Sequence, residues 1–250
     1  MNLEERSSLE IKVMTFNIHH GKGMDLKVDL NRIAEVIEKS NAHIIGLNEV
    51  DKHFSKRSYF EDQISWLAKQ LNMNYAFSPS LSLKPKTMSK VRQYGNALLS
   101  RYPIVAKSSY LFDLISGVIE GRSLLEATIQ INNQLVLVNV THLSINPYLH
   151  KKQTDFILNR LSNYSYPFII MGDWNMMPGS RGWRKMTRET QDAWYIAGIG
   201  AGHTYPSLHP RVRLDYIFVS HHFQVIKAEI FTKTPNASDH LPLKATLNYH

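Results

Sequence analysis

Short apolar runs with the composition of β-strands dominate this sequence, and many follow one another with only a few residues between them. The closest succession covers residues 94–100, 104–112, 122–131 and 134–143, and Asn132-Asn133 suits a turn between the last two runs. Strands joined by such short connections pair in antiparallel fashion. We therefore expect the chain to build its core from β-sheets rather than from a helix bundle.

Amphipathic helices are predicted in a few stretches that lie between the strand-like runs. Residues 29–41, 60–72 and 148–162 carry apolar residues at helical spacing. Because strands outnumber helices, the economical architecture is a layered α/β sandwich, in which two mixed sheets pack face to face with helices outside. Loops at the strand ends would then share one rim, where functional sites usually form.

Length and composition indicate a single folded unit. The chain has 250 residues, of which 43% are hydrophobic and 20% charged, and it contains neither a Pro/Gly/Ser-rich linker nor an internal repeat. We expect an N-terminal extension over residues 1–10 and one domain over residues 11–250. No apolar run approaches the roughly 18 residues of a membrane span. Nothing in the sequence indicates an oligomeric state.

The absence of cysteine excludes disulfides, thiolate metal sites and a cysteine nucleophile. It fits a cytoplasmic protein, and the first residues lack the apolar segment of a signal peptide. Secretion stays open if a signal peptide has been removed. The formal net charge of +8 favours polyanionic partners such as nucleic acid, acidic lipid headgroups or phosphorylated small molecules, although this signal is weak by itself.

Polar residues of a few types stand where the apolar runs begin or end. Each has a structural interpretation: Asp173 and Asn175 in "GDWN" are common turn residues, and His19 and His20, taken singly, are expected to be structural rather than ligands. Their accumulation at so many strand ends is hard to explain by turns alone. The set comprises Asn17, His19, His20, Glu49, Asn96, Arg122, His142, Asp173, Asn175, Asp215, Asp239 and His240.

This set of residue types suits metal-assisted hydrolysis of a phosphoester. Carboxylate oxygens with an asparagine carbonyl suit a hard divalent cation such as Mg²⁺, which keeps several waters and meets a substrate phosphate. A histidine paired with a buried aspartate makes a general base with a fixed tautomer. A second histidine, an arginine and an asparagine can donate hydrogen bonds to a phosphoryl oxygen on which charge develops.

The ordered segments "TFNIHHG", "LNEV", "YGNALLSR", "THL", "GDWN", "LDYIF" and "SDHLP" resemble the endonuclease/exonuclease/phosphatase superfamily, which includes DNase I. The resemblance covers about residues 11–248. It implies the DNase I-like fold, a four-layered α/β sandwich of two mixed β-sheets with helices outside. It also implies a phosphoester hydrolase that uses Mg²⁺, or alternatively Mn²⁺ or Ca²⁺.

The resemblance also implies a role for each matching residue. Glu49 would be the main metal ligand, with Asn17 beside it and Asp239 close to the metal or its waters. His240, oriented by Asp215, would take the proton of the attacking water. Asp173 and Asn175 would face the scissile phosphate and its nucleophile, and His142 with Asn175 would stabilise the phosphorane. Arg122 would hold a phosphate oxygen, and Asn96 would support this phosphate-binding part of the site.

The substrate is left open by the sequence. His142 occupies a position where the AP endonuclease branch has tyrosine, so the chain departs from that branch. Basic segments at 84–92 and 181–188 flank the expected site and favour a nuclease acting on DNA or RNA. A phospholipid (sphingomyelinase-like) or inositol-phosphate hydrolase is the alternative. A catalytically inactive binding module is less favoured, because the expected catalytic set is intact.

Overall fold

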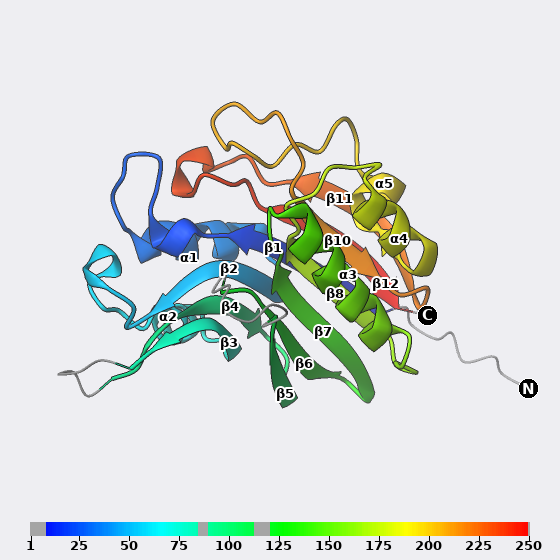
Figure 1. Ribbon diagram of the computed structural model, residues 1–250, viewed down its shortest axis with the longest axis horizontal. Coiled ribbons are helices and arrows are strands. Elements are labelled where there is room, and N and C mark those ends of the chain that lie inside the picture. Colours follow the sequence, from blue (N-terminus) through cyan, green and yellow to red (C-terminus); the bar gives the residue numbers. More distant parts are fainter. Residues whose placement is uncertain (1–8, 85–89, 113–120, 250) are drawn as a thin grey trace, which may run out of the picture.

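The computed structural model describes residues 9–84, 90–112 and 121–249, and it consists of two six-stranded β-sheets with helices on their outer faces (Figure 1). The first sheet has the strand order β11-β12-β1-β2-β4-β3. Its strands are β1 (Leu9–Asn17), β2 (Ile44–Lys52), β3 (Asn74–Leu83), β4 (Arg92–Ser100), β11 (Phe223–Ile230) and β12 (Leu243–Tyr249).

The second sheet has the strand order β5-β6-β7-β8-β10-β9. Its strands are β5 (Ile104–Leu111), β6 (Ser123–Ile131), β7 (Gln134–His142), β8 (Phe168–Asp173), β9 (Gln191–Asp192) and β10 (Asp215–Val219). The expected turn at Asn132-Asn133 joins β6 to β7, and Asn132 adopts a left-handed φ of 52°. Asparagine tolerates this conformation better than most residues.

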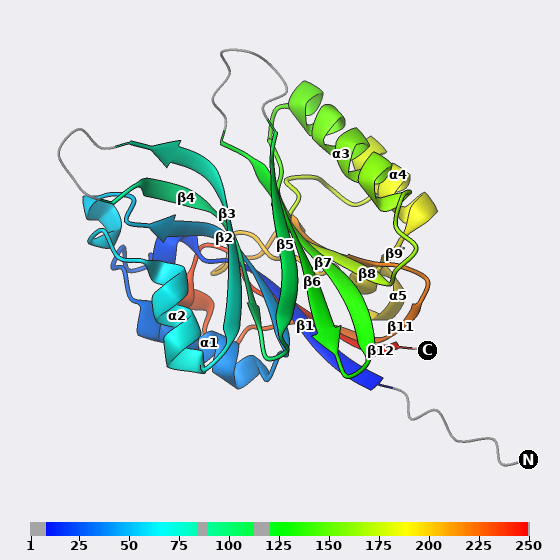
Figure 2. The same ribbon diagram turned by 90° about the horizontal axis from the view of Figure 1, so that it is seen from below.

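One parallel strand pair lies inside each sheet, and in each case a helix makes the crossover. Helix α1 (Leu30–Ser40) connects β1 to β2, and α3 (Pro147–Leu161) connects β7 to β8. Figure 2 shows α1 and α2 (Gln63–Leu71) against the first sheet, and α3 and α4 (Arg181–Glu189) against the second. The order helix, sheet, sheet, helix is the four-layered sandwich that the sequence predicted.

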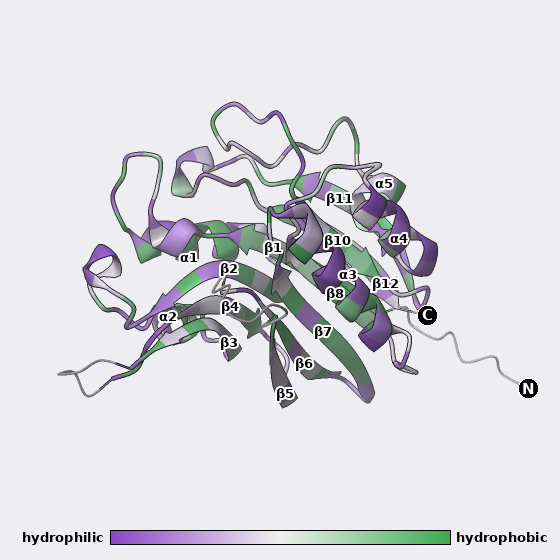
Figure 3. Ribbon diagram, viewed as in Figure 1, coloured by the Kyte–Doolittle hydropathy of each residue, from purple (hydrophilic) through white to green (hydrophobic). Residues whose placement is uncertain are grey.

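Three apolar clusters follow from this layering. The first lies between the sheets, the second lies under α1 and α2, and the third lies under α3 and α4. The sheets approach so closely at Gly46 that an added Cβ would lie 2.8 Å from Cγ of Met171. Figure 3 shows the resulting contrast between apolar strands and the hydrophilic α4.

Some elements differ from the expectations. Strand β3, which no apolar run had indicated, buries only Ala76, Ser78 and Ser80 and so lacks a strong hydrophobic signal. The basic stretch 181–188 forms helix α4, whose first turn is capped by Ser180 accepting from the backbone N–H of Trp183. The remaining short helices are α5 (Ala193–Ala197), which packs on β11 and β10, and the 3₁₀ helices η1 (His19–Gly21), η2 (Lys56–Ser58) and η3 (Pro235–Ala237).

Parts of the expected boundaries fall outside the described residues. Of the expected N-terminal extension, residues 1–8 lie outside them, whereas Leu9 and Glu10 belong to β1 and pair with Tyr249 and Asn248. Of the basic segment 84–92, residues 85–89 lie outside the described residues. None of the helices in the described ranges has the length and apolar character that crossing a membrane requires.

Candidate active site

Strand register alone places three of the predicted residues in one row across the second sheet. His142 at the end of β7 pairs with Asp173 at the end of parallel β8, and Asp173 pairs with Asp215 at the start of antiparallel β10. In the first sheet, Asn17 at the end of β1 pairs with Asn48 of β2. Because β1 and β8 pack face to face, the two rows meet at one edge of the sandwich.

Glu49 reaches this edge through an irregularity in β2. The pairing of β2 with β4 shifts register between Leu47 and Val50, and Glu49 takes a left-handed φ of 59°. A bulge of this kind turns a side chain away from the direction that regular alternation would give it. The side chain is half-buried, and its Oε1 accepts a hydrogen bond of 3.2 Å from the amide of Asn17.

His240 and Asp215 form the buried pair that the sequence predicted. Nδ1 of His240 lies 2.8 Å from Oδ2 of Asp215, and its Nε2 lies 3.7 Å from Oδ2 of Asp173. Burial by itself would lower the pKa of His240, but the carboxylates of Asp215 and Asp173 raise it to about 10. The pair thus fixes the ring orientation and leaves Nε2 facing the site.

Asp173 contacts several of the other site residues. Its Oδ1 accepts from the backbone N–H of Asn175 at 3.0 Å, and its Oδ2 accepts from the Asn17 amide at 3.2 Å. The same Oδ2 lies 3.3 Å from Nε2 of His142. Burial, opposed by the charge of His240, raises the pKa of Asp173 to about 7. A carboxyl group with such a pKa can exchange a proton near neutral pH.

His142 and Asn175 lie against each other beside Asp173. Nδ2 of Asn175 is 3.1 Å from Nε2 of His142 and donates a 2.9 Å hydrogen bond to the carbonyl oxygen of Leu143. Burial and the nearby Arg122 lower the pKa of His142 well below its ordinary value, so this ring is neutral. A phosphoryl oxygen would have to replace one of these acceptors to be bound by Asn175.

The two residues expected to contact phosphate differ in position. Arg122 precedes β6, and its Nε is buried without a partner among the described residues, so a donor is available for an anion. Asn96 is buried in β4, where its amide donates to the carbonyl oxygen of Ser123 at 2.8 Å and accepts from Asn48 at 2.8 Å. These bonds place Asn96 among the residues that brace the site.

Residues that could hold a metal ion lie near Asn17, at the end of β1. Glu49 and Asp239 offer carboxylate oxygens, and the His19 ring lies between them, with Nδ1 3.6 Å from Oδ1 of Asp239. Asn17 turns its amide nitrogen toward Glu49 and Asp173, while its Oδ1 accepts from the backbone N–H of His19 at 3.1 Å. In this orientation Asn17 positions the carboxylates.

The structure adds residues that sequence reasoning missed. Asn48 bridges the sheets, because it accepts from the backbone N–H of Asp173 at 2.9 Å and donates to the carbonyl oxygen of Thr141 at 2.9 Å. The ring of Tyr205 packs on His240 with centroids 4.8 Å apart, and Ser238 donates to the carbonyl oxygen of Asn17 at 2.7 Å. Asn48 stands in the quoted "LNEV", so an amide within an apolar run was a usable signal. Ser238 likewise stands in the quoted "SDHLP", whereas Tyr205 gave no signal.

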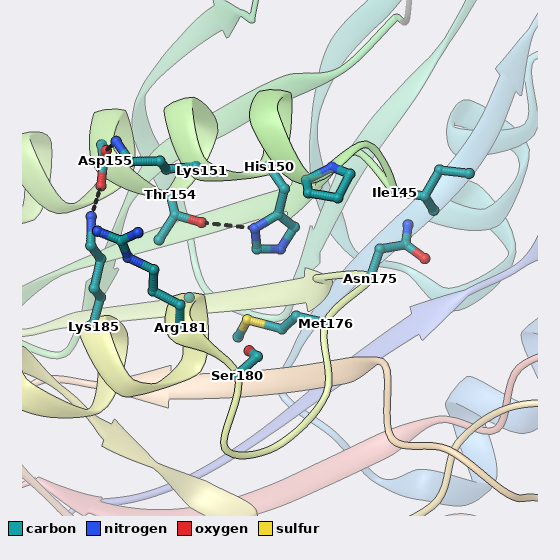
Figure 4. A pocket seen from close by; sticks show the side chains of 12 residues that line it. Ile145, His150, Lys151, Thr154, Asp155, Asn175, Met176, Ser180, Arg181 and Lys185 are labelled. Atoms are coloured by element: carbon teal, nitrogen blue, oxygen red, sulfur yellow. Dashed lines mark hydrogen bonds and ion pairs between the residues drawn. The ribbon is translucent and has the colours of Figure 1, made fainter.

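A cavity of about 400 Å³ opens beside Asn175, between α3 and α4. Figure 4 shows Ile145 and Met176 near Asn175, with Arg181 and Lys185 farther along the cavity. Lys185 pairs with Asp155, whereas Arg181 has no ion-pair partner among the described residues. The cavity therefore joins an apolar part to a cationic part next to the site.

Comparisons with known proteins agree with this arrangement. The solved structures that match include an endonuclease/exonuclease/phosphatase from Beutenbergia cavernae, with a TM-score of 0.82, 23% identity and coverage of 96% of this chain and 72% of that one. A mannosyl-6-phosphatase from Bacteroides thetaiotaomicron matches with a TM-score of 0.76, 17% identity and coverage of 95% and 99%. The human Nocturnin catalytic domain matches with a TM-score of 0.70, 20% identity and coverage of 96% and 95%.

These likenesses confirm the DNase I-like fold. No curated protein matches the sequence significantly. The family assignment comes from the sequence, because residues 14–240 match the model of the Endonuclease/Exonuclease/phosphatase family. This chain belongs to the Endonuclease/Exonuclease/phosphatase family.

Proposed function

We propose that this protein is a divalent-metal-dependent phosphoesterase that hydrolyses phosphodiester bonds by attack of a water molecule activated by His240. The observation that carries the proposal is the buried arrangement of Asp215, His240 and Asp173. Nδ1 of His240 is held at 2.8 Å by Asp215, and Nε2 faces Asp173 at 3.7 Å. A histidine fixed in this way can take a proton at Nε2.

The donor set fits a hard divalent cation. The carboxylates of Glu49 and Asp239 would hold Mg²⁺, or Mn²⁺ or Ca²⁺, at the edge of the first sheet, and Asn17 would keep the Glu49 carboxylate in place through its 3.2 Å hydrogen bond. Such an ion would supply positive charge that polarises a bound phosphate.

The remaining residues act on the phosphate and on protons. In its neutral form His240 would accept the water proton at Nε2, and Asp215 would stabilise the imidazolium that forms. Arg122 contributes its unpartnered guanidinium nitrogen to a phosphate oxygen. His142 and Asn175 would donate hydrogen bonds to the oxygens of the phosphorane, and would give up the contacts that they make now in order to do so. Asp173 holds the Asn175 backbone and exchanges protons with its histidine neighbours.

Nucleic acid is the substrate class we favour. Arg181, Arg184 and Arg188 are exposed on α4, which borders the cavity beside Asn175, and the whole chain has a formal net charge of +8. Cations placed beyond the scissile phosphate would grip neighbouring phosphates of a polynucleotide. The intact set of site residues argues against an inactive binding module.

A small phosphorylated molecule is the second candidate. The cavity of about 400 Å³ is large enough for a sugar-sized or inositol-sized leaving group, and one structural neighbour is a mannosyl-6-phosphatase. A phospholipid headgroup would meet the same cavity. These substrates need few contacts outside it, whereas a polynucleotide uses the exposed arginines of α4.

A substrate panel tests both candidates. Plasmid DNA, single-stranded DNA and RNA oligonucleotides, inositol phosphates, sugar phosphates and sphingomyelin vesicles are each incubated with Mg²⁺ and with EDTA. We expect cleavage of a nucleic acid that EDTA abolishes and that Glu49→Gln removes, whereas His221→Ala on an exposed turn retains it. Release of phosphate or headgroup from the small substrates alone would select the second candidate, and equal hydrolysis in EDTA would contradict the metal dependence.

A further inference from the structure

Two adjacent histidines that the proposed mechanism does not use form a cluster with Glu49. His19, His20 and Glu49 each offer one ligand atom, and these atoms all lie within 4.8 Å of one another. The histidines belong to η1, directly after β1, whereas Glu49 comes from the bulge in β2. Parallel pairing of β1 with β2 brings the two segments together.

The environment of the His20 ring indicates a ligand. Its exposed fraction is only 7%, and its Nδ1 is buried without a hydrogen-bond partner. Such an atom costs free energy on folding, about 1–3 kcal/mol for a polar group of this kind, unless something binds it. His20 is moreover held firmly, because its carbonyl oxygen accepts a 2.7 Å hydrogen bond from the buried Gln63.

His19 and Glu49 are the accessible members of the cluster. The His19 ring meets the His20 ring edge to face, with centroids 4.6 Å apart, and Nδ1 of His19 faces Asp239 at 3.6 Å. The guanidinium of Arg57, whose charge acts on His20, pairs with Asp51 at 2.7 Å. His19 and Glu49 are partly exposed, so the cluster is accessible from solvent.

The backbone of the cluster is conformationally strained. His19, His20 and Glu49 have φ values of 46°, 47° and 59°, in the left-handed region that side chains with a Cβ rarely adopt. Strained residues of this kind gather at functional sites, where the surrounding structure enforces them. Here the strained positions are those that hold one ligand atom each of His19, His20 and Glu49 within 4.8 Å of one another.

We propose that His19, His20 and Glu49 bind a divalent ion of the Zn²⁺ type, with two imidazole nitrogens and one carboxylate as ligands. Two histidines and a glutamate are a known set of three protein ligands in catalytic zinc sites, whose fourth position is left for water or substrate. Imidazole suits Zn²⁺ and Co²⁺, whereas Mg²⁺ prefers oxygen ligands.

This inference deepens the proposed function, since Glu49 belongs to both sites. It predicts that the metal selectivity of the phosphoesterase is set by the histidines after β1. With Glu49 alone the site would favour hard cations, and with His19 and His20 it favours borderline transition metals at much lower concentration.

Co²⁺ is the probe of choice, because its visible absorption reports imidazole coordination directly. EDTA-stripped protein is titrated with Co²⁺ by absorption and by calorimetry without any substrate, and then with Zn²⁺ as a competitor. We expect one Co²⁺ per chain, displaced by Zn²⁺. His19→Ala/His20→Ala should weaken Co²⁺ binding by at least about tenfold and remove the absorption band.

The chain offers a matched control in a second adjacent pair, His221 and His222, which is exposed and outside the cluster. His221→Ala/His222→Ala should leave the Co²⁺ affinity and spectrum unchanged. The single variant His19→Ala, at a half-buried rim position, provides a folded test if the double variant does not fold. An unchanged Co²⁺ spectrum and affinity in either folded variant would overturn the proposal.

The outcome separates this proposal from the proposed function. Loss of Co²⁺ binding in a protein that cleaves none of the panel substrates would support the metal cluster and contradict the phosphoesterase. If the protein cleaves a panel substrate with Mg²⁺ but binds Co²⁺ equally well without His19 and His20, the result would support the phosphoesterase and contradict the metal cluster.

Discussion

At the scale of single residues, the pairing of His240 with Asp215 makes a quantitative prediction. His240→Ala should lower the rate of phosphoester hydrolysis by about 10² to 10⁴, the usual contribution of a general base. Asp215→Asn should cause much of the same loss, because it removes the group that orients Nδ1 at 2.8 Å. The rates of both variants and of the double variant form the measurement. A double variant slowed by the full product of the single losses would show two independent residues.

The same pair predicts how stability depends on pH. The pKa of His240 is raised from 6.5 to about 10 in the folded protein, so the folded state binds the proton more tightly than the unfolded chain. The stabilisation is therefore complete below pH 6.5 and is lost as the pH rises toward 10. Urea unfolding in EDTA should show a larger drop in unfolding free energy between pH 7 and 10 for the wild type than for Asp215→Asn/His240→Gln. Parallel curves would contradict the raised pKa.

At the scale of elements, the contact between β7 and β8 decides whether His142 and Asp173 meet. Gly172 has a φ of 146°, a region essentially restricted to glycine, and an added Cβ would lie 1.8 Å from the carbonyl oxygen of Thr141. We expect Gly172→Ala to destabilise the protein by more than about 3 kcal/mol and to abolish activity in whatever remains folded.

Gly179 is the matched control for this substitution. It has a φ of 76°, but nothing lies within 4 Å of an added Cβ. Gly179→Ala should therefore cost only the left-handed penalty of about 1–2 kcal/mol and keep the site intact. Thermal or urea unfolding measures both variants, and similar losses would mean that the strand contact at Thr141 is not what requires glycine.

At the scale of the whole molecule, the distribution of charge predicts how binding responds to salt. If α4 grips a polynucleotide, Arg181→Ala/Arg184→Ala/Arg188→Ala should make the log–log salt slope for duplex DNA shallower by about one unit for each phosphate that these arginines neutralise. KM should rise with little change in kcat, because the arginines hold substrate and transition state alike. Exposed lysines elsewhere give the control, Lys39→Ala/Lys69→Ala/Lys107→Ala, which removes equal charge from α1, α2 and β5. Equal effects of the two triple variants would show a general charge effect rather than a site on α4.

The success of the sequence predictions differed between elements. Strands such as β7 and β8 were predictable because their apolar runs are buried on both faces, and the residues that end them stand at the rim for the same reason. Strand β3 and helix α4 were not, because β3 is half-exposed and α4 is almost entirely polar on its outer face. Asn48 was overlooked because its hydrogen bonds reach residues about 48 to 125 positions away.

The sequence by itself determined the alternation of apolar runs and helices, hence the layered sandwich, and the types of residue that gather at its rim. These properties are local, since they depend on which side chains must be buried and on where each run ends. Which of these rim residues lie together depends on the tertiary structure. Strand pairing forms the row of His142, Asp173 and Asp215. A bulge in β2 brings Glu49 close to His19 and His20. Strand register, bulges and the packing of one sheet on the other bring together residues that lie far apart in the chain. The contacts that stabilise this arrangement are long-range, so no short segment of the sequence contains them.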